Sequence, residues 1–536
     1  MKKIVYLIAF MAFAFVSCET NEMPNETPIE SNLNTNADLI IHIVKKLENP
    51  YSVTNMRKAQ MKLQQEGLMR TDVNIQATHL YVRFLPKDSA DFETLMNDTS
   101  LELFSYPLDC ELTAGEKYID STLLGNQFTW LYTRVPVDFV SPVSNYEILE
   151  DLYLPTETTG SQQARQAMKS INTDNWKLLE RKSLELTGNA LQTTTQPSGM
   201  QKARWWPQVT INVFDDLVGK FIPVEGVTVL ARWWFNWESG ITNSQGIAKI
   251  SGSFGGKVNY HIKWDADYWS IRDGAFEQAY SNNPSQSGNW VANIDGGKSK
   301  AYAHVHRACW TMFYGDNLGA SDQSKNDRFI LENRQKISVY DNQGTGINYG
   351  ANWFVFSQIS IHMKEDDGTL RTSEDVYATT IHELAHSFHI MDMDVDLASY
   401  AFVGKLIYES WASAVDWAVT SKEYGRLKGY SYNYSDNKQS KWGLLKTDYS
   451  KIYYGDKAYS PVFIDLMDNL NQVEFSSSLY EYPNDNVTGF TLSELSGILR
   501  KTFTLNGLKT NVKALRTDET TLSNIDKLFE TYEKVK

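Results

Sequence analysis

Cysteine is scarce in this chain, with three residues in 536: Cys18, Cys110 and Cys309. So few cysteines exclude both a small disulfide-stapled framework and a cysteine-rich zinc array. Basic residues are also in deficit, because 51 Lys and Arg stand against 65 Asp and Glu and leave a formal net charge of −14. Nucleic acids and anionic lipids are bound through basic surfaces, so no nucleic-acid partner is expected.

The remaining composition is that of a globular protein. Hydrophobic residues make up 42 % of the chain and charged residues 22 %, which excludes a wholly disordered chain or a low-complexity array. At ordinary domain sizes the length predicts roughly three or four domains. Aromatic content is high at 13 %, with 15 tryptophans, so large buried clusters or aromatic binding surfaces are expected.

The beginning of the chain has the three parts of an export signal. Lys2 and Lys3 form a positive start, residues 4–16 form an apolar run, and the small residue Ser17 precedes Cys18. The run is about 13 residues long, whereas a helix that crosses a bilayer needs about 20, so it is not expected to span a membrane. A buried N-terminal strand or a short anchor is the alternative interpretation.

The stretch Phe15-Val16-Ser17-Cys18 resembles a bacterial lipobox. The resemblance implies that residues 1–17 are a lipoprotein signal peptide and that Cys18 becomes the lipid-bearing N-terminus. Residues 18–36 are polar and without periodicity, which indicates a flexible tether. We therefore expect an exported lipoprotein held at the outer membrane or cell surface by its lipid, with a periplasm-facing location as the alternative. Cys110 and Cys309 are then either one disulfide or two buried thiols.

The rest of the chain divides into three predicted units, which together make a multidomain protein. Residues 37–195 are expected to form an α+β domain of unknown role. This region has a helical pattern over residues 39–47, a strand pattern at His79–Leu85 and a helix-rich segment at Ser161–Gly188. Residues 301–536 combine a strand-like stretch, Trp353–Met363, with long helical patterns, so the C-terminal part is expected to be mainly helical.

Residues 205–272 are predicted to form a small antiparallel β-sandwich. Val209–Val213, Gly226–Ala231 and Tyr260–Trp264 are short β-branched runs, and Thr242–Gly246 is typical of a turn. The order Pro223-Val-x-Gly-Val-x-Val229, followed by Ser-Gln-Gly246, resembles the carboxypeptidase-regulatory-like sandwich found beside many bacterial peptidases. Five tryptophans of this region could form a glycan-stacking face, but core and inter-domain packing is the favoured interpretation. They are Trp205, Trp206, Trp233, Trp234 and Trp237.

The chemistry-bearing motif is H-E-x-x-H at His382-Glu383-Leu384-Ala385-His386. On a helix, positions i and i+4 share a face about 6 Å apart, so two imidazoles can converge on one Zn²⁺. Glu383, next to the first histidine, can reach a water molecule at the metal and act as general base. With nine histidines in the chain, a chance match has a probability of roughly 1 %.

The flanking residues predict the helix that the motif needs. Thr372 is a plausible N-cap with Asp375 three residues later, and no Gly or Pro interrupts residues 372–391. An apolar stripe runs along the side away from the histidines. It consists of Tyr377, Ile381, Leu384 and Phe388.

A catalytic zinc needs a third protein ligand, for which the sequence offers several candidates. His389 shares the face of His382 but lies about 10 Å further along an unbroken helix. Asp392 and Asp394 follow in the loop. Glu409 is favoured, because it is a lone acid among apolar residues in a second helical stretch predicted from Leu397 to about Val419, and such an acid is costly to bury unless it is paired or bound to metal.

With these residues the chain resembles the gluzincin group of zinc metallopeptidases. The resemblance implies a zincin-like α+β catalytic domain at residues 301–536, with His382, His386 and Glu409 as zinc ligands and Glu383 as general base. It also implies an edge strand before the active helix, which binds extended substrate by strand addition and matches Trp353–Met363.

Two features of that group need other residues here. The group commonly has an acid four residues after the ligand glutamate, a position that Ser413 occupies, so either Ser413 or Asp416 is expected to orient an imidazole, with a plain surface role as the alternative. The group also often uses a downstream Tyr or His to stabilise the oxyanion. Since His389 is the last histidine, Tyr459 is the predicted catalytic residue, with Tyr453 or Tyr454 as alternatives and ordinary packing as the competing interpretation.

The expected function is therefore that of a zinc-dependent metallopeptidase acting on extracellular or periplasmic protein or glycoprotein. One rival is a surface lipoprotein that binds glycan or protein and carries a non-catalytic zinc site. The other is a metal hydrolase acting on an ester or on an acylated sugar or peptide, since the metal ligands set water activation and the pocket sets the substrate.

Overall fold

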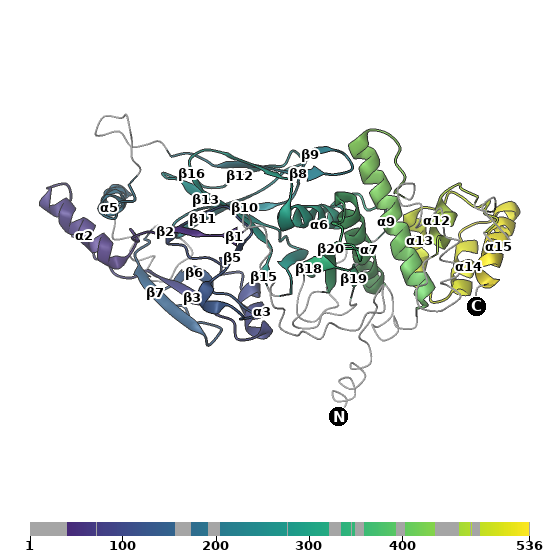
Figure 1. Cartoon of the computed structure of the whole chain (residues 1–536), viewed down its shortest axis with the longest axis horizontal. Helices are drawn as coiled ribbons and strands as arrows, with labels where there is room; N and C mark the ends of the chain where they lie inside the picture. Colours follow the sequence, from purple (N-terminus) through teal and green to yellow (C-terminus); the bar gives the residue numbers. More distant parts are fainter. Residues whose placement is uncertain are drawn as a thin grey trace, which may run out of the picture.

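The computed structural model describes residues 40–70, 72–155, 173–190, 204–275, 277–320, 334–344, 346–348, 358–392, 403–434, 460–471, 473 and 483–534. Figure 1 shows the described elements along one long axis, with the N-terminal elements at one end and the C-terminal helices at the other. The chain is a mixed α/β protein with several separate sheets, as expected for a multidomain α+β protein.

The N-terminal unit is built on a three-stranded antiparallel sheet. The strand predicted at His79–Leu85 is confirmed as the central strand of this sheet, between β6 and β7. The elements are β1 (Ile40–Ile41), β2 (Ile43–Lys46), α2 (Val53–Gln65), β3 (His79–Phe84), α3 (Ser89–Asn97), β4 (Cys110–Leu112), β5 (Lys117–Tyr118), a 3₁₀ turn (Ser121–Leu123), β6 (Leu131–Pro136), β7 (Tyr146–Leu152) and α5 (Thr173–Leu186).

The helix predicted over residues 39–47 is wrong, since β1 and β2 occupy this stretch. β1 pairs with β5 and β2 with β4, which satisfies their backbone groups. An amphipathic helix would need its apolar side chains on one buried face, yet Ile41 is buried while Val44 is 61 % exposed. Short β-branched runs of this kind favour strands once a partner strand is available.

The middle unit is a two-sheet β-sandwich. One sheet has the order β11-β10-β13-β16 and the other β12-β8-β17, with β9 paired to β8. Along β8 the side chains of Val209, Ile211 and Val213 are fully buried between less buried neighbours, which is the alternation that the sequence showed. The strands are β8 (Gln208–Asp215), β9 (Lys220–Pro223), β10 (Thr228–Trp233), β11 (Asn236–Ile241), β12 (Ile247–Lys249), β13 (Val258–Lys263), β16 (Tyr280–Gln286) and β17 (Trp290–Ile294).

Two details of the predicted sandwich are corrected. Its strands continue to Ile294, beyond the expected limit at residue 272, and β17 lies parallel to β8, so the sandwich is not purely antiparallel. Moreover, strand β14 (Trp269–Asp273) leaves the sandwich and pairs with β18 (Gln335–Gln343) of the next sheet. These differences arise because strand partners come from distant parts of the chain, which a local pattern does not report.

The tryptophans of the sandwich pack mainly against the N-terminal unit. Trp233 and Trp234 lie 6.3 and 6.4 Å from the ring of Tyr51, and Trp237 lies 5.5 Å from that of Phe104. Trp205 is half-buried and donates its indole N–H to a backbone carbonyl of the sandwich. The favoured packing interpretation therefore holds for these four.

Trp206 is the exception among the five, with 65 % of its surface exposed. A buried ion cluster also joins the N-terminal unit to the third unit. Glu93 of α3 lies 2.6 Å from Arg272 of β14 and 2.9 Å from Lys336 of β18. The N-terminal unit therefore shares both an apolar core and a buried ion cluster with the rest of the molecule.

The third unit has a five-stranded sheet in the order β15-β14-β18-β20-β19. β14, β18 and β20 are parallel, and β15 and β19 are antiparallel to their neighbours. The added elements are β15 (Glu277–Gln278), α6 (Gly297–Phe313), β19 (Ile347–Asn348), β20 (Ile359–Lys364), α7 (Ser373–Asp392) and α9 (Lys405–Lys428).

The strand expected at Trp353–Met363 is present in part. Its described part is β20, which begins at Ile359, while residues 353–357 lie outside the described residues. β20 is not the edge strand that was expected, because β19 pairs along its outer side. Within the described part of the chain, the two-residue β19 therefore ends this side of the sheet.

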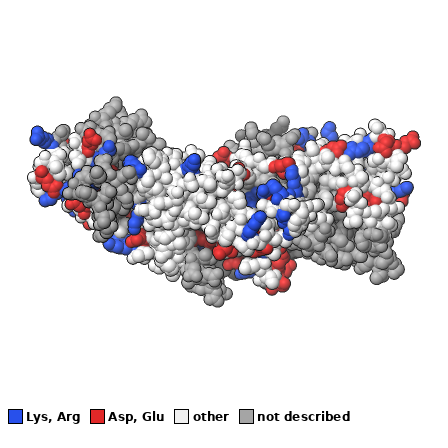
Figure 2. Space-filling model, turned by 90° about the horizontal axis from the view of Figure 1, so that it is seen from above, with Lys and Arg blue, Asp and Glu red and all other residues white. Residues whose placement is uncertain are grey.

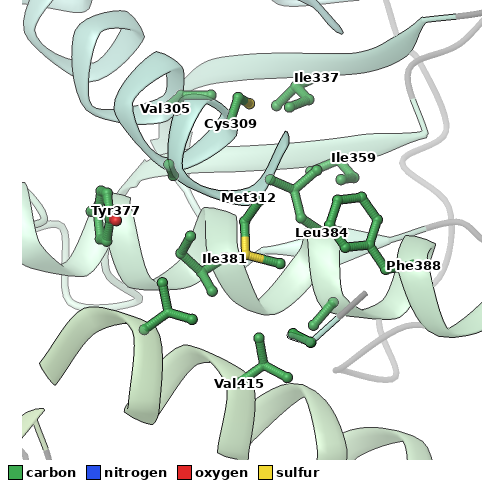
Figure 3. Close-up of a cluster of buried hydrophobic side chains, with 14 of the residues drawn as sticks. Val305, Cys309, Met312, Ile337, Ile359, Tyr377, Ile381, Leu384, Phe388 and Val415 are labelled. Atoms are coloured by element: carbon green, nitrogen blue, oxygen red, sulfur yellow. The ribbon is translucent and has the colours of Figure 1, made fainter. Parts of the chain in front are cut away.

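A large apolar core holds the three helices of this unit on the sheet. Figure 3 shows side chains of α6 and α7 meeting strands β18 and β20 on one side, while α9 approaches α7 from the other. The predicted stripe of α7 is confirmed, since its four side chains are at most 1 % exposed. The labelled residues are Val305, Cys309, Met312, Ile337, Ile359, Tyr377, Ile381, Leu384, Phe388 and Val415. This packing fixes α7 from two sides.

The C-terminal end is helical, as expected. Its elements are α12 (Val462–Met467), α13 (Leu492–Leu499), α14 (Leu505–Lys513) and α15 (Glu519–Lys534). α13 begins with a complete capping box between Thr491 and Glu494. Among the described residues, no helix combines the length and the apolar character needed to cross a membrane. On the face shown in Figure 2, basic and acidic side chains lie in neighbouring groups, as on a mixed solvated surface.

Candidate metal centre

The helix that carries the H-E-x-x-H motif begins where the sequence predicted. The hydroxyl of Thr372 accepts a hydrogen bond from the backbone N–H of Asp375, and the Asp375 carboxylate accepts one from the Thr372 hydroxyl at 2.7 Å. The carboxylate of Asp216, which follows β8, accepts the N–H of Ser373, the first helical residue, at 3.0 Å. Acidic groups at a helix N-terminus are favourable, so both contacts stabilise the start of α7.

His382, His386 and Glu409 converge at one point between α7 and α9. The Nε2 atoms of His382 and His386 each lie 3.4 Å from the same carboxylate oxygen of Glu409. The ligand atoms of the three side chains all lie within 4.8 Å of one another. Among the described residues, this is the group of three or more His, Cys, Asp or Glu side chains that could hold a metal ion.

The spacing and the donor types fit zinc. Ligands about 2.0–2.1 Å from a tetrahedral Zn²⁺ are separated by about 3.3 Å, close to the two observed nitrogen–oxygen distances. Two imidazoles and one carboxylate leave a fourth position open, which is the arrangement of catalytic rather than structural zinc sites. Glu409 and His386 are fully buried and His382 is 6 % exposed, so the donor set lies in a site largely shielded from solvent.

The electrostatics of the three side chains also indicate a cation. Burial alone would raise the pKa of Glu409, but hydrogen bonds with His382 and His386 outweigh burial and hold that pKa well below its usual range. A carboxylate that stays charged with no exposed surface needs a positive partner. In the metal-free protein a protonated histidine fills that role, and a bound metal ion would replace the proton.

Asp416 orients His382 from the next turns of α9. The Nδ1 atom of His382 donates to a carboxylate oxygen of Asp416 at 3.1 Å, which leaves Nε2 facing Glu409. Burial lowers the pKa of His382, but the hydrogen bonds with Asp416 and Glu409 outweigh it and raise the pKa to about 9. Ser413 is fully buried, and its hydroxyl has no hydrogen-bond partner among the described residues. Of the two predicted orienting residues, Asp416 therefore makes the contact.

Glu383 lies beside the donor set and under the chain that leads into β19. Its side chain is 1 % exposed, and its negative charge is one of the causes that raise the pKa of His382. A Cβ atom added at Gly346 would lie 2.5 Å from Oε1 of Glu383 and 2.5 Å from the methyl of Thr379. The sequence reasoning missed Gly346, since a single glycine in a Gly-rich stretch carries no motif.

A buried ion cluster behind the centre ties the metal-bearing helices to the sandwich. Arg307 of α6 lies 3.4 Å from Asp215 of β8 and 3.0 Å from Glu423 of α9. The hydroxyl of Tyr424, also on α9, donates to Asp215 at 2.8 Å. Because each group has a charged or hydrogen-bonded partner, the cluster fixes α9 relative to α6 and the sandwich.

The other residues that the sequence singled out lie elsewhere. His389 is buried on α7 and is not a member of the three-residue group, and burial together with the charge of His386 lowers its pKa to about 3. Asp392 is the last residue of α7 and is also outside the group. Cys110 and Cys309 are free thiols, so the disulfide alternative is wrong. Five further candidates lie outside the described residues: Cys18, Asp394, Tyr453, Tyr454 and Tyr459.

The second helical stretch is confirmed, with different bounds. It was expected from Leu397, whereas α9 begins at Lys405 after the N-cap Gly404, and residues 397–402 lie outside the described residues. It ends at Gly429, whose φ of 76° is the left-handed conformation that glycine adopts without steric cost. Comparison of the chain with protein-family models, with curated proteins and with solved structures gave no match.

Proposed function

We propose that this chain is a zinc-dependent metallopeptidase that hydrolyses peptide bonds of extracellular or periplasmic protein or glycoprotein. The observation that carries the proposal is the convergence of His382, His386 and Glu409 at 3.4 Å separations, with Glu383 on the same helix. These three side chains would hold the zinc ion, which supplies Lewis-acid activation of a water molecule and of the scissile carbonyl group. The likeness of this donor set to that of gluzincins supports the same assignment.

The protein's own residues have separate roles in this proposal. Glu383 accepts the proton of the attacking water and passes it to the leaving amine. Asp416 holds the ring of His382 in the tautomer that keeps Nε2 for the metal. The low exposure of Glu383 keeps its carboxylate away from bulk water, where a charge–dipole interaction is stronger.

The geometry near Glu383 favours an extended peptide as substrate. β19 ends the described sheet on this side, and the residue that leads into it, Gly346, lies against Glu383. A strand at the end of a sheet can accept an extended peptide as an additional strand through its free backbone groups. Such pairing would bring a peptide backbone beside the general base, which a small ester would not exploit.

The test is proteolysis by the full chain with casein and a mucin glycoprotein as substrates. We expect cleavage by the zinc-loaded wild type, loss of cleavage after chelation, and recovery when zinc is restored. Glu383→Gln should lose cleavage but keep zinc, whereas Glu409→Ala should lose both. Asp392→Asn is the matched control, because Asp392 lies on the same helix outside the donor group. Equal cleavage by wild type, chelated wild type and Glu383→Gln would refute the proposal.

The export of this chain as a lipoprotein anchored through Cys18 is also proposed, on the resemblance of residues 15–18 to a lipobox. Metabolic labelling with a palmitate analogue tests it, with Cys18→Ala as the negative control. Label retained in that variant would refute anchoring at Cys18. The rival glycan-binding surface is not favoured, because four of the five sandwich tryptophans are engaged in packing.

A further inference from the structure

A second pair of acidic side chains lies among the C-terminal helices, at the end of the molecule that carries α12 to α15 (Figure 1). Asp468 is the residue after α12, and Asp485 lies in the segment that leads to α13. The two segments run side by side. At one end the N–H of Phe490 donates to the carbonyl of Leu466 at 3.2 Å, and at the other the N–H of Asp485 donates to the side-chain oxygen of Asn471 at 3.2 Å. Both aspartates are therefore confined between these two connections.

Asp485 is a buried carboxylate with an unused oxygen. Its residue is 3 % exposed, and Oδ1 accepts the backbone N–H of Val487 at 2.9 Å. Oδ2 is enclosed and has no hydrogen-bond donor among the described residues. A buried polar atom without a partner costs free energy, so an enclosed carboxylate oxygen needs either a proton or a cation.

Asp468 adds a second negative charge beside this oxygen. Its Oδ1 accepts the N–H of Leu470 at 3.1 Å. Burial, opposed by a backbone hydrogen bond and assisted by the charge of Asp468, raises the pKa of Asp485 to about 7, and burial raises the pKa of Asp468 to about 6. Among the described residues no Lys or Arg forms an ion pair with either carboxylate, and the nearby Arg516 is paired with Glu494.

The other polar groups around the pair are oxygen-bearing amides. Asn471, Asn484 and Asn486 bond to one another across the two segments, at 2.9 Å between Asn471 and Asn484. This network holds the segments together and leaves the carboxylates to face a ligand. Two carboxylates in a setting of amide and backbone oxygens, without His or Cys, suit a hard cation such as Ca²⁺ rather than zinc.

We propose that Asp468 and Asp485 form a calcium site that joins the end of α12 to the segment preceding α13. Calcium takes six to eight oxygen ligands, so backbone carbonyls and water complete the set. With two carboxylates the affinity falls in the weak range of about 10⁻⁴–10⁻³ M that is typical of extracellular modules. The site is structural and independent of the zinc centre: it links loops and touches no proposed catalytic residue.

The experiment is calcium uptake by the full chain, measured by equilibrium dialysis at neutral pH with zinc present throughout. We expect one calcium per chain at about 10 mM CaCl₂ and a rise of about 2 °C or more in the melting temperature of the C-terminal helical part. Asp485→Asn should weaken uptake at least tenfold. In calcium-free buffer it should melt at or above the wild-type temperature, because it removes like-charge repulsion.

Two further samples separate the proposal from alternatives. Asp468→Asn should also lose uptake, and it serves as the readout if Asp485→Asn fails to fold. Asp518→Asn is the matched control, because Asp518 also accepts a backbone N–H but is exposed. Absence of calcium uptake by the wild type, or equal uptake by wild type and Asp485→Asn, would overturn the proposal by assigning the pair to proton sharing. Neither result bears on zinc content, so the two metal proposals fail independently.

Discussion

The contact between His382 and Asp416 leads to a prediction about zinc affinity. The two side chains are 6 % and 1 % exposed, and the 3.1 Å hydrogen bond between them fixes the imidazole ring. Asp416→Ala removes that bond, so the ring can rotate and its Nε2 atom spends less time facing the other ligands. Losing such a supporting carboxylate typically costs 10–100-fold in metal affinity, or about 1.4–2.7 kcal/mol.

A second effect of Asp416 opposes the first and depends on pH. The raised pKa of His382, about 9 against the ordinary 6.5, means that zinc must displace a proton at neutral pH. At pH 7 this competition lowers wild-type zinc affinity roughly 100-fold relative to its value above pH 9. Without Asp416 the pKa of His382 falls and the competition weakens. The affinity loss of Asp416→Ala should therefore be smallest near pH 7 and reach its full size above pH 9.

The same proton also contributes to the stability of the metal-free protein. Because the folded-state pKa of His382 lies above its unfolded value, the stabilisation is fully present below pH 6.5 and is lost as the pH rises through about 9. Metal-free wild type should thus lose stability over this window, and Asp416→Ala should lose less. Chemical denaturation at three pH values measures the difference.

The affinity assay is competition with a chromophoric zinc chelator across this pH range, with Ser413→Ala as the control. Ser413 is as buried as Asp416 and lies on the same helix, but makes no hydrogen bond to the imidazole. We expect Ser413→Ala to bind zinc as the wild type does at every pH. The reasoning is refuted if Asp416→Ala matches the wild type above pH 9, or if Ser413→Ala shows the same loss.

Three other predictions concern the packing around the centre. Gly346→Ala should lower peptidase activity at least ~10-fold while zinc stays bound, because its Cβ meets Glu383 at 2.5 Å, and Gly497→Ala, with open space at its Cβ, should leave activity unchanged. Burial lowers the pKa of His306 to about 4, so its contribution to stability is present above pH 6.5 and is lost as the pH falls through 4. Urea unfolding of metal-free protein should show a loss of about 2–3 kcal/mol from this group between pH 7 and pH 4.5, and an unchanged pH dependence in His306→Gln would contradict it. Leu384→Ala should cost about 2–5 kcal/mol and Leu384→Met less than about 1.5 kcal/mol in the same assay, because Leu384 is fully buried, and equal costs would argue against a close-packed core.

The metal-bearing helix was predictable because its information is local. The cap at Thr372, the spacing of His382 and His386, and the apolar stripe all lie within 20 residues, and each reports the helical period directly. Glu409 could be proposed from one further fact, that a lone acid among apolar side chains needs a partner. The structure brings these three ligands together, which is a geometric match and not a test of catalysis.

Errors occurred where a pattern fits two partners equally well. Residues 39–47 fit a helix by period, yet their pairing with β4 and β5 makes them strands. The parallel pairing of β17 with β8 joins strands whose sequences carry no mark of each other. The choice between Ser413 and Asp416 was likewise open, since the two side chains lie one turn apart on the same helix.

The sequence by itself thus determined the elements that carry the chemistry: a capped helix with two histidines and a general base, and a second helix with an acid. The tertiary structure decided which side chains meet. It chose Asp416 over Ser413, laid Gly346 against Glu383, merged the N-terminal unit with the sandwich through its tryptophans, and enclosed Asp485 beside Asp468. The physical reason is that periodicity and capping act over a few residues, whereas contacts between faces depend on the packing of the whole chain.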